Sequence, residues 1–340
     1  MTTLTHPIFK YPIPIAILVL ILCAPLKSEG LHSKGALSFF FENDVFAGTD
    51  QHYTNGIMFR WLSAEIDAEG SGRPLPLWFQ RLVRTLSPRN DKEYKHAFSA
   101  SLGQKIFTPE DISQTEPGPE AQPYAGVTYM EVGIQSRSLK RLDSYVLSLG
   151  IIGEHSYAGS LQVLIHRLFK FTTPMGWESQ LKDEFIFNMY YETISRRARM
   201  GGTEGFGLDV FTDMGAGVGN GFVGAGGGLM LRTGWNLPMD FGPSLMLPRG
   251  EALFAQKKLA VTFFSAFNAS YVLHDIVLDG TFNTDIPLPP RKSIYGEISA
   301  GIEIYSGRFK IVWSGVLWNK RLRTQLRPHI YGSINLSYCF

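Results

Sequence analysis

The sequence predicts an all-β fold, a transmembrane antiparallel up-and-down β-barrel of about 12 strands with a short helix in an extracellular connection. Segments in which apolar and polar residues alternate recur along the 340 residues, and such alternation is typical of strands with two different faces. Charged residues make up only 18% of the chain, against about 25% in soluble domains. The last segment alternates strictly and ends in Phe340. These three observations favour a barrel wall that faces lipid.

Residues 1–30 have the layout of a secretory signal peptide, with Lys10 followed by an apolar run over residues 13–24. This run of about 12 residues is shorter than the stretch of about 20 that a spanning helix needs. We therefore expect residues 1–30 to be removed and residues 31–340 to form the barrel. Lipid attachment at Cys23 is disfavoured because the bulky Leu22 precedes it.

Composition argues against two classes of protein. Once the leader is removed, Cys339 is the only cysteine left, which excludes a small secreted domain held together by disulfides. The formal net charge of +2 gives no reason to expect a nucleic-acid partner.

Twelve alternating runs can be marked, and their even number predicts that both chain ends lie on the periplasmic side of a closed barrel. The runs are near 36–45, 54–64, 95–106, 124–137, 142–152, 184–198, 205–217, 220–234, 257–274, 290–305, 308–319 and 330–340. Parity then places the connections near 46–53, 107–123, 153–183, 218–219, 275–289 and 320–329 on the outer side. A site shared by the first and third of these connections becomes feasible.

Two of the runs also predict what fills the barrel. In residues 184–193 and 294–305, apolar side chains share one face and polar side chains the other, as a membrane barrel requires. Tyr190, Tyr295 and Tyr305 fall on the predicted inner face, where they would help to fill a narrow lumen.

The C-terminal segment predicts an assembly partner. A final Phe340 with Tyr338 two places earlier resembles the end signature of bacterial outer-membrane barrels, which the barrel-assembly machinery reads. We therefore expect that machinery to bind this strand. An ordinary edge strand is the alternative.

Two segments have helical spacing instead. Residues 75–86 include apolar residues at that spacing and could form a periplasmic interfacial helix. In residues 161–168, Leu161, Leu164, Ile165 and Leu168 form one apolar stripe. This second helix lies within the third outward connection.

The densest polar cluster is the hairpin over residues 42–56, which joins the first two strands. Its carboxylates and amides are hard oxygen ligands that suit Ca²⁺, although polar residues also make ordinary hairpin turns. Only Glu42 separates Asn43 and Asp44 from the apolar residues 39–41. They therefore lie at the end of a strand rather than at the tip of the loop, which favours a function.

The second polar pair lies on the predicted helix over residues 161–168. Gln162 and His166 are four residues apart and so share one helix face beside the apolar stripe. A neutral imidazole can take a proton from water near neutral pH, so His166 is the candidate general base. A structural role is the alternative for a lone histidine.

At these residues the chain resembles the outer-membrane lipid A 3′-O-deacylase (LpxR-type) family. The resemblance covers about residues 36–198 and then continues mainly as barrel pattern. It is carried by Glu42-Asn43-Asp44, Tyr53-Thr54-Asn55-Gly56, Pro123-Tyr124-Ala125-Gly126, Gln162 with His166, and Gly176-Trp177 with Gln180 and Glu184.

The resemblance implies a twelve-stranded outer-membrane barrel whose active site on the outer rim hydrolyses the ester of the 3′ acyloxyacyl chain of lipid A, with calcium as cofactor. It makes His166 the catalytic histidine, Asn43 and Asp44 the Asn-Asp pair at the metal and oxyanion, and Thr54 the hairpin hydroxyl. Gln162 would help to shape the site.

One departure from the family affects the predicted metal site. The family has a glutamate six residues after the histidine, where this chain has Thr172. Metal binding could then shift to Glu178 or Asp50. We take Asp44, Asn43 and Glu178 as the predicted ligands.

Two rival functions remain. The stretch from His52 to Gly56 is similar to the His-x-Ser-Asn-Gly stretch of outer-membrane phospholipases, with Thr54 in place of the nucleophilic serine. A porin or passive barrel is the non-enzymatic alternative. The basic residues 320–323 could bind lipid A phosphates or simply form a solvated loop.

Overall fold

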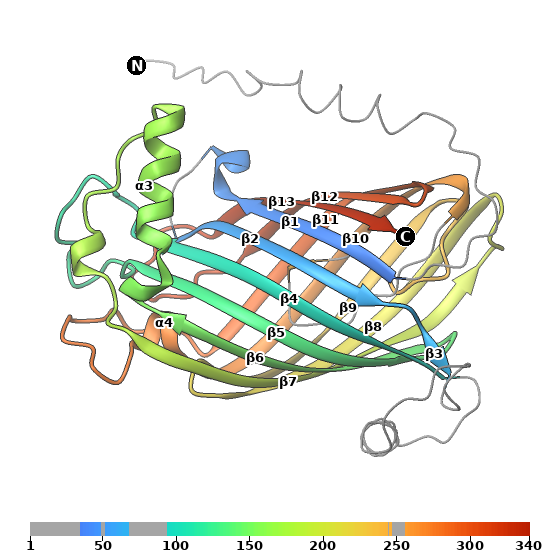
Figure 1. Cartoon of the computed structure of the whole chain (residues 1–340), viewed down its shortest axis with the longest axis horizontal. Coiled ribbons are helices and arrows are strands. Elements are labelled where there is room, and N and C mark those ends of the chain that lie inside the picture. Colours follow the sequence, from blue (N-terminus) through green and yellow to red (C-terminus); the bar gives the residue numbers. More distant parts are fainter. Residues whose placement is uncertain (1–34, 49–51, 68–93, 244, 247–255) are drawn as a thin grey trace.

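The computed structural model describes residues 35–48, 52–67, 94–243, 245–246 and 256–340, which Figure 1 shows as a barrel lying on its side. Within these residues, twelve long antiparallel strands close into a ring, and the two-residue β3 pairs only with the start of β4. The strands are β1 (Gly35–Asn43), β2 (His52–Ser63), β3 (Ile66–Asp67), β4 (Lys95–Thr108), β5 (Ala125–Arg137), β6 (Arg141–Ile152), β7 (Glu184–Met200), β8 (Phe206–Gly219), β9 (Phe222–Trp235), β10 (Gln256–Asp275), β11 (Ile294–Gly307), β12 (Phe309–Trp318) and β13 (His329–Cys339). The predicted fold class is confirmed.

The helices are short. They are η1 (Asp44–Ala47), η2 (Glu154–Ser156), α3 (Ala158–Phe169), η3 (Trp177–Ser179) and α4 (Ile276–Asp279). The helix predicted over residues 161–168 lies inside α3, whereas the leader over residues 1–30 and the helix predicted over residues 75–86 lie outside the described residues. In the part of the chain that is described, no helix is both long and apolar enough to cross a membrane.

The first and last strands close the barrel. β1 pairs with β13 from Ala36 opposite Cys339 to Asn43 opposite Gly332, and β1 also pairs with β2, which pairs with β4. Each of the twelve predicted runs is a strand. β1 ends at Asn43 because the Oδ1 of Asn43 accepts a hydrogen bond from the backbone N–H of Val45 (2.7 Å) and caps η1.

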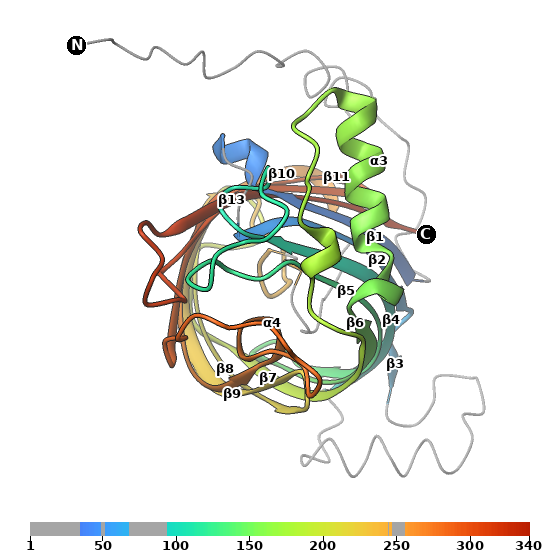
Figure 2. The same cartoon turned by 90° about the vertical axis from the view of Figure 1, so that its left-hand side faces the viewer.

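The two ends of the barrel differ. We call the end where β1 begins and β13 finishes the terminal rim. The opposite end, which Figure 2 faces, carries η1, η2, α3, η3 and α4, and we call it the α3 rim.

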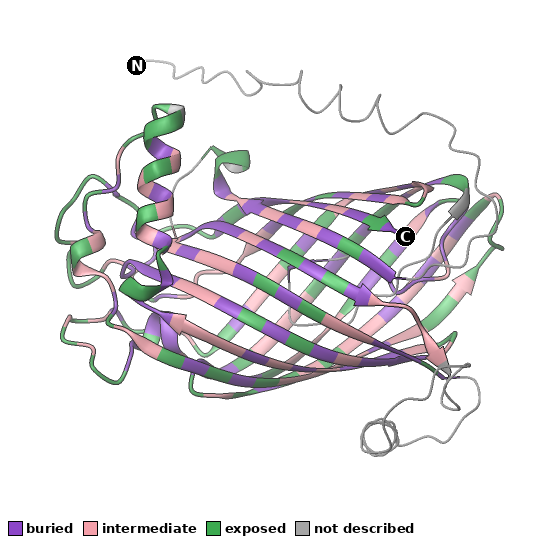
Figure 3. Ribbon diagram, viewed as in Figure 1, coloured by how far each residue is buried: buried purple, intermediate pink, exposed green. Residues whose placement is uncertain are grey.

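Exposed and buried residues alternate along the strands of the wall, as Figure 3 shows. Phe59 is exposed while the next residue, Arg60, is buried inside the barrel, and Ile298 and Ser299 show the same alternation. The exposed apolar residues of the wall include Leu37, Leu102, Met130, Phe187 and Phe263. This is the pattern of a barrel wall that faces lipid.

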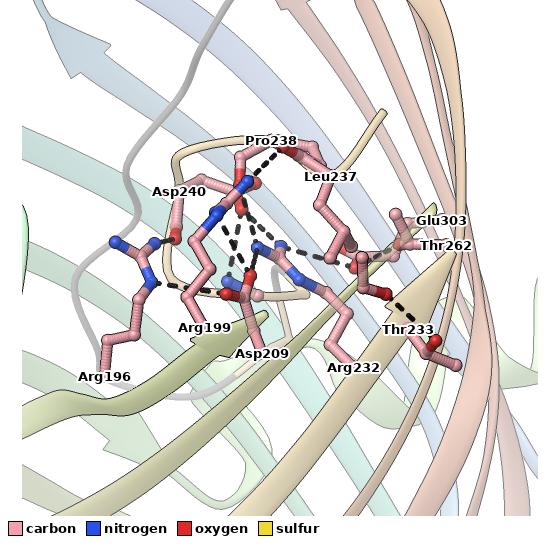
Figure 4. Close-up of polar contacts among 12 residues, drawn as sticks. Arg196, Arg199, Asp209, Arg232, Thr233, Leu237, Pro238, Asp240, Thr262 and Glu303 are labelled. Atoms are coloured by element: carbon pink, nitrogen blue, oxygen red, sulfur yellow. Dashed lines mark hydrogen bonds and ion pairs between the residues drawn. The ribbon is translucent and has the colours of Figure 1, made fainter. Parts of the chain in front are cut away.

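The connection from β9 to β10 folds from the terminal rim into the lumen. Its Asp240 pairs with the guanidinium of Arg232 and lies 3.6 Å from the Nζ of Lys310, and Arg232 also donates to Asp209 (2.8 Å). Figure 4 shows this buried network, in which Arg196 and Arg199 also take part. Because buried charges are stable only when paired, the network fixes the connection inside the barrel.

The same connection reaches almost to the other end of the lumen. The sulfur of Met246 lies 3.8 Å from the hydroxyl of Tyr53, the second residue of β2. A cavity of about 410 Å³ extends from there to the α3 rim, lined among others by Tyr190 and Tyr295. Tyr190 and Tyr295 thus lie on the inner face as predicted, and Tyr305, also predicted there, donates a hydrogen bond to Asp240 of the inserted connection.

Candidate functional site

The predicted site residues lie at the α3 rim in two groups on adjoining parts of the wall. η1 packs over β13 and β2, and α3 packs over β4 and β5; Figure 2 shows both helices at this rim. Because β2 and β4 are paired, the two groups adjoin. The η1 group is Asn43, Asp44 and Thr54, and the α3 group is Gln162, His166 and Glu178.

The Glu-Asn-Asp motif divides at the wall. Glu42 points into the lumen, where the hydroxyl of Tyr53 donates to its Oε2 (2.7 Å). Successive residues of a strand point to opposite faces, so Asn43 lies on the outer face. Asp44 begins η1 and is fully buried. Only Asn43 and Asp44 of this motif therefore belong to the outer site.

A glycine on β13 provides the seat for η1. A Cβ added at Gly332 would lie 2.7 Å from the Cβ of Phe46, and the ring of Phe46 also meets the ring of Phe41 edge-on, with centroids 6.0 Å apart. A larger residue at position 332 would push η1 off the wall, and with it Asp44.

Thr54 occupies a β-bulge. The pairing of β2 with β4 shifts between Tyr53 and Asn55, and a bulge re-aims the side chains around it. As a result Tyr53 stays inside the lumen, while the Oγ1 of Thr54 lies 2.7 Å from the Oγ1 of Thr108. Both threonines are buried. This hydroxyl pair lies on the neighbouring strands β2 and β4, where the two groups adjoin.

α3 is seated on the wall at its first residue. A Cβ added at Gly126 would lie 2.3 Å from the Cβ of Ala158, so only glycine permits this contact. Next to it, Gln104 and Thr128 donate to the backbone carbonyl of Ser156 at 2.9 and 2.8 Å. These polar residues on the outer face are therefore satisfied by the segment that leads into α3.

Gln162 holds the return segment against α3. Its Oε1 accepts a hydrogen bond from the indole N–H of Trp177 (2.8 Å), and the Trp177 ring packs on Tyr124 with centroids 5.1 Å apart. A Cβ added at Gly176 would meet that Tyr124 ring at 2.4 Å. The Nε2 of Gln162 is buried and has no acceptor among the described residues. The amide therefore has one structural hydrogen bond and one donor available.

His166 lies one turn further along the same face of α3 and is buried. Its Nδ1 is 2.5 Å from the backbone carbonyl oxygen of Thr172, and its ring meets Phe171 edge-on at 5.7 Å. A carbonyl can only accept, so Nδ1 carries the proton and Nε2 of the neutral ring is the basic nitrogen. The side chain of Thr172 is exposed and takes no part in this contact.

The predicted metal ligands are divided between the two groups. Asp44 is buried in η1, whereas Glu178 is exposed on η3. Across the described ranges, no cluster of three or more His, Cys, Asp or Glu residues could hold a metal ion. A cation at Asp44 would therefore need neutral oxygens as its other ligands. Asp50 lies outside the described residues.

An ion pair joins the two ends of the α3 arm, residues 153–183. The Nδ1 of His155 lies 2.6 Å from Oδ2 of Asp183, whose other oxygen accepts from the His155 backbone N–H. The hydrogen bond to Asp183 and its charge raise the pKa of His155 above the ordinary 6.5. The pair therefore ties η2 to the residue just before β7.

Several supporting residues carried no sequence signal for their roles. Thr108 was unmarked because only the register of β2 against β4 brings it to Thr54. The sequence marked Gly126, Gly176 and Trp177 as motif residues. It did not show that they hold α3 against the wall. Arg321 of the basic cluster lies over the Trp318 ring, 3.4 Å from its centroid, and lines the lumen cavity.

Comparison with known families decides the relationship. The model of the family described as outer membrane protein LpxR matches residues 15–340. The chain belongs to the LpxR family. Its fold agrees: the structure of LpxR from Salmonella typhimurium aligns with a TM-score of 0.71 at 14% identity, covering 90% of this chain and 100% of that one. This LpxR-family chain is accordingly an outer-membrane barrel.

Other barrels are more distant from this LpxR-family member. The β domain of the Bordetella autotransporter BrkA aligns with a TM-score of 0.45 at 10% identity, covering 91% of this chain and 100% of that one. The translocator domain of NalP from Neisseria meningitidis gives 0.32 at 9% identity, covering 96% of each chain. No curated protein matches the sequence.

Proposed function

We propose that this protein is a lipid A 3′-O-deacylase whose α3 rim faces the cell exterior. It would hydrolyse the ester that holds the 3′ acyloxyacyl chain of lipid A. Membership of the LpxR family supports the reaction class. The observation that carries the proposal is the buried His166, whose Nδ1 is held by the Thr172 carbonyl on a helix at the outer face of the wall. A lipid can reach such a site without leaving the membrane.

In this proposal His166 is the general base. Its Nε2 takes a proton from a water molecule, and the hydroxide oxygen forms a bond to the ester carbonyl carbon. When the tetrahedral intermediate collapses, the bond to the sugar oxygen breaks and the proton on Nε2 passes to that oxygen. The products are a fatty acid and a free 3′ hydroxyl, and no acyl-enzyme is formed.

Two amides and one hydroxyl are candidates for stabilising the oxyanion. The Oδ1 of Asn43 is occupied by the N–H of Val45, so its Nδ2 is the group that can donate to the substrate. The buried Nε2 of Gln162 is a second donor. Thr54 can donate when Thr108 donates to it. Preorganised donors of this kind typically account for about 3–4 kcal/mol each.

Calcium fits the donors present as a site with few protein charges. Asp44 would supply a buried carboxylate, and a second lone pair on the Oδ1 of Asn43 would supply a neutral oxygen. The predicted ligand Glu178 belongs to the α3 group, so neutral oxygens would have to complete the site at Asp44. Ca²⁺ accepts backbone and amide oxygens and water as ligands, so the lack of an acidic triad among the described residues does not conflict with it. When bound, the cation would polarise the ester carbonyl.

The proposed partners follow from the location of the site. Lipid A, as part of lipopolysaccharide, would be the substrate, and the barrel-assembly machinery would recognise β13 together with Phe340, which follows it. Outer-membrane lipid would contact the remaining wall.

Two alternatives receive less support. A phospholipase with Thr54 as nucleophile would need a reactive hydroxyl, but Thr54 is buried and bonded to Thr108 rather than to a histidine. A porin would need an open lumen, and here the Asp240 and Met246 connection occupies it.

Mass spectrometry of lipid A tests the proposal. Cells would express the intact protein, His166→Ala, His274→Ala or an empty vector, with membrane insertion checked for each protein. His274 is the matched control because it belongs to β10, across the barrel from β4. We expect loss of one 3′-linked acyloxyacyl unit with the intact protein and His274→Ala only. Unchanged lipid A in the presence of the folded intact barrel would overturn the deacylase. Activity retained in His166→Ala would overturn the base.

A further inference from the structure

α3 exposes apolar side chains although it lies in a connection. Along α3 and the residues that follow it, the exposed fractions are 54% for Leu164, 69% for Leu168, 48% for Phe171 and 52% for Met175. The opposite face, with Gln162 and His166, is buried. A helix that stood in water would place its polar side outward, so this helix has the reverse polarity.

The direction of α3 explains this polarity. In Figures 1 and 2 α3 runs across the barrel axis at the α3 rim, and its far end projects beyond the wall. The barrel axis approximates the membrane normal, so α3 lies roughly parallel to the membrane plane. This is the orientation of an interfacial helix.

The level of α3 agrees with the edge of the apolar belt. α3 begins against Gly126, the second residue of β5. At the same rim, the wall carries exposed apolar residues right to the strand ends, at Phe185 of β7, Ile294 of β11 and Ile330 of β13. The exposed face of α3 therefore continues the lipid-facing surface of the wall.

Two basic residues accompany the apolar ones. Arg167 and Lys170 are exposed on the last turn of α3 and its cap. Basic residues beside apolar ones suit the boundary between acyl chains and anionic headgroups. The charge of this surface is thus complementary to an anionic leaflet.

From these observations we infer that α3 is an interfacial helix whose exposed face rests in the outer leaflet. Leu164, Leu168 and Phe171 contact lipid acyl chains, and Arg167 and Lys170 contact anionic headgroups. This inference rests on the orientation proposed above. It also places His166, on the opposite face of α3, at the depth where acyl chains join the headgroup of a lipid.

Site-directed fluorescence in vesicles tests the inference without requiring turnover. Both cysteines of the full chain are replaced (Cys23→Ser, Cys339→Ser), and an environment-sensitive nitrobenzoxadiazole label is attached at Leu168→Cys. Leu102→Cys on the lipid-facing wall and Glu116→Cys in the exposed β4–β5 connection are the matched controls. The vesicles contain lipids with nitroxide quenchers at a shallow or a deep position of the acyl chain.

We expect the label at position 168 to emit at shorter wavelength than the label at 116. The shallow quencher should act about two-fold more strongly than the deep one, because interfacial helices sit about 5–10 Å below the headgroups. A label at 168 with the emission and quenching of position 116 would overturn the inference. Since the readout is insertion, a lipid A deacylase that failed its own test would leave this result standing.

A second arm tests the two charges. Shallow quenching at position 168 should be stronger in vesicles with anionic lipid than in neutral ones, and the difference should disappear in Arg167→Gln with Lys170→Gln. Equal quenching in both lipids would overturn the headgroup contact.

Discussion

Nδ1 of His166 is bound by the backbone carbonyl of Thr172, 2.5 Å away. The main chain thus orients the imidazole through residue 172, the position where the resemblance described above implies a glutamate side chain. Because this contact uses the backbone carbonyl, the tautomer of His166 does not depend on the side chain at position 172.

The first prediction separates the side chain of Thr172 from its carbonyl. His166→Gln should lower the rate of lipid A deacylation by roughly 100- to 10,000-fold, the range for loss of a general base. Thr172→Ala retains the carbonyl and should cost at least about ten-fold less than His166→Gln. Rates on purified lipopolysaccharide measure both. Equal losses would show that the threonine side chain, and not the carbonyl, is what matters.

A second prediction concerns the hydrogen bond from the Trp177 indole to the Oε1 of Gln162. Trp177→Phe keeps a ring on Tyr124 but leaves the buried Oε1 of Gln162 without its donor, which should cost about 1–3 kcal/mol in the free energy of unfolding. Urea titration of the barrel in vesicles measures this. Trp61→Phe, on the lipid-facing wall, is the control and should change stability less. A larger loss of stability in Trp61→Phe than in Trp177→Phe would contradict a stabilising role of this hydrogen bond.

The seat of α3 gives a third prediction. Gly126→Ala places a Cβ against Ala158 at 2.3 Å and should displace α3. A shift of about 1 Å can lower turnover by up to about 100-fold. Gly315→Ala is the matched control, because a Cβ there meets nothing within 4 Å. Both barrels should fold, as shown by heat-dependent mobility in gels. Full activity of Gly126→Ala would show that the contact of Gly126 with Ala158 does not position α3 for catalysis.

The fourth prediction is a pH dependence at η2. Because the pKa of His155 is raised above 6.5, its charged bond to Asp183 is fully present below 6.5 and is lost as the pH rises through the raised pKa. Burial acts to raise the pKa of Asp183, but the hydrogen bonds from His155 outweigh it and lower that pKa below 3.8. Asp183 therefore keeps its contribution above 3.8 and loses it as the pH falls through the lowered pKa.

NMR titration of the His155 ring protons tests this prediction. The midpoint should lie above 6.5 in the intact protein and return toward 6.5 in Asp183→Asn. A midpoint that is the same in both proteins would show that the pair does not form.

A fifth prediction addresses the lumen. Arg232→Met leaves Asp209 and Asp240 buried without this cation and should destabilise the barrel by about 3–5 kcal/mol. Lys258→Met removes an exposed pair with Glu204 and should cost about 0–1 kcal/mol. Urea unfolding measures both. Conductance across a planar bilayer should rise only in Arg232→Met, and a similar rise in Lys258→Met would argue against the filled lumen.

The barrel could be predicted from the sequence because strand alternation is a local signal. The positions of Phe59 and Arg60 within an alternating run are enough to assign them to opposite faces of the wall. Each predicted run is a strand in the structure. The inserted connection could not be anticipated, since the contact of Met246 with Tyr53 joins residues 193 positions apart without any local pattern.

For the candidate site, the sequence predicted which residues take part but not how they contact one another. His166 and Asn43 stand out by residue type and motif, but the use of the Gln162 Oε1 by Trp177 depends on how the return segment folds. Glu42 and Asn43 point to opposite faces of the wall. This follows from strand alternation and could have been predicted from the strand alone. The bulge that turns Thr54 toward Thr108 is a register effect.

Because α3 and η1 lie over adjoining strands, the candidate site faces one side of the barrel. For the proposed deacylase, turnover in a crowded membrane would depend on how often this side of the barrel meets fresh lipid, and hence on rotation of the barrel and lateral exchange of its neighbours.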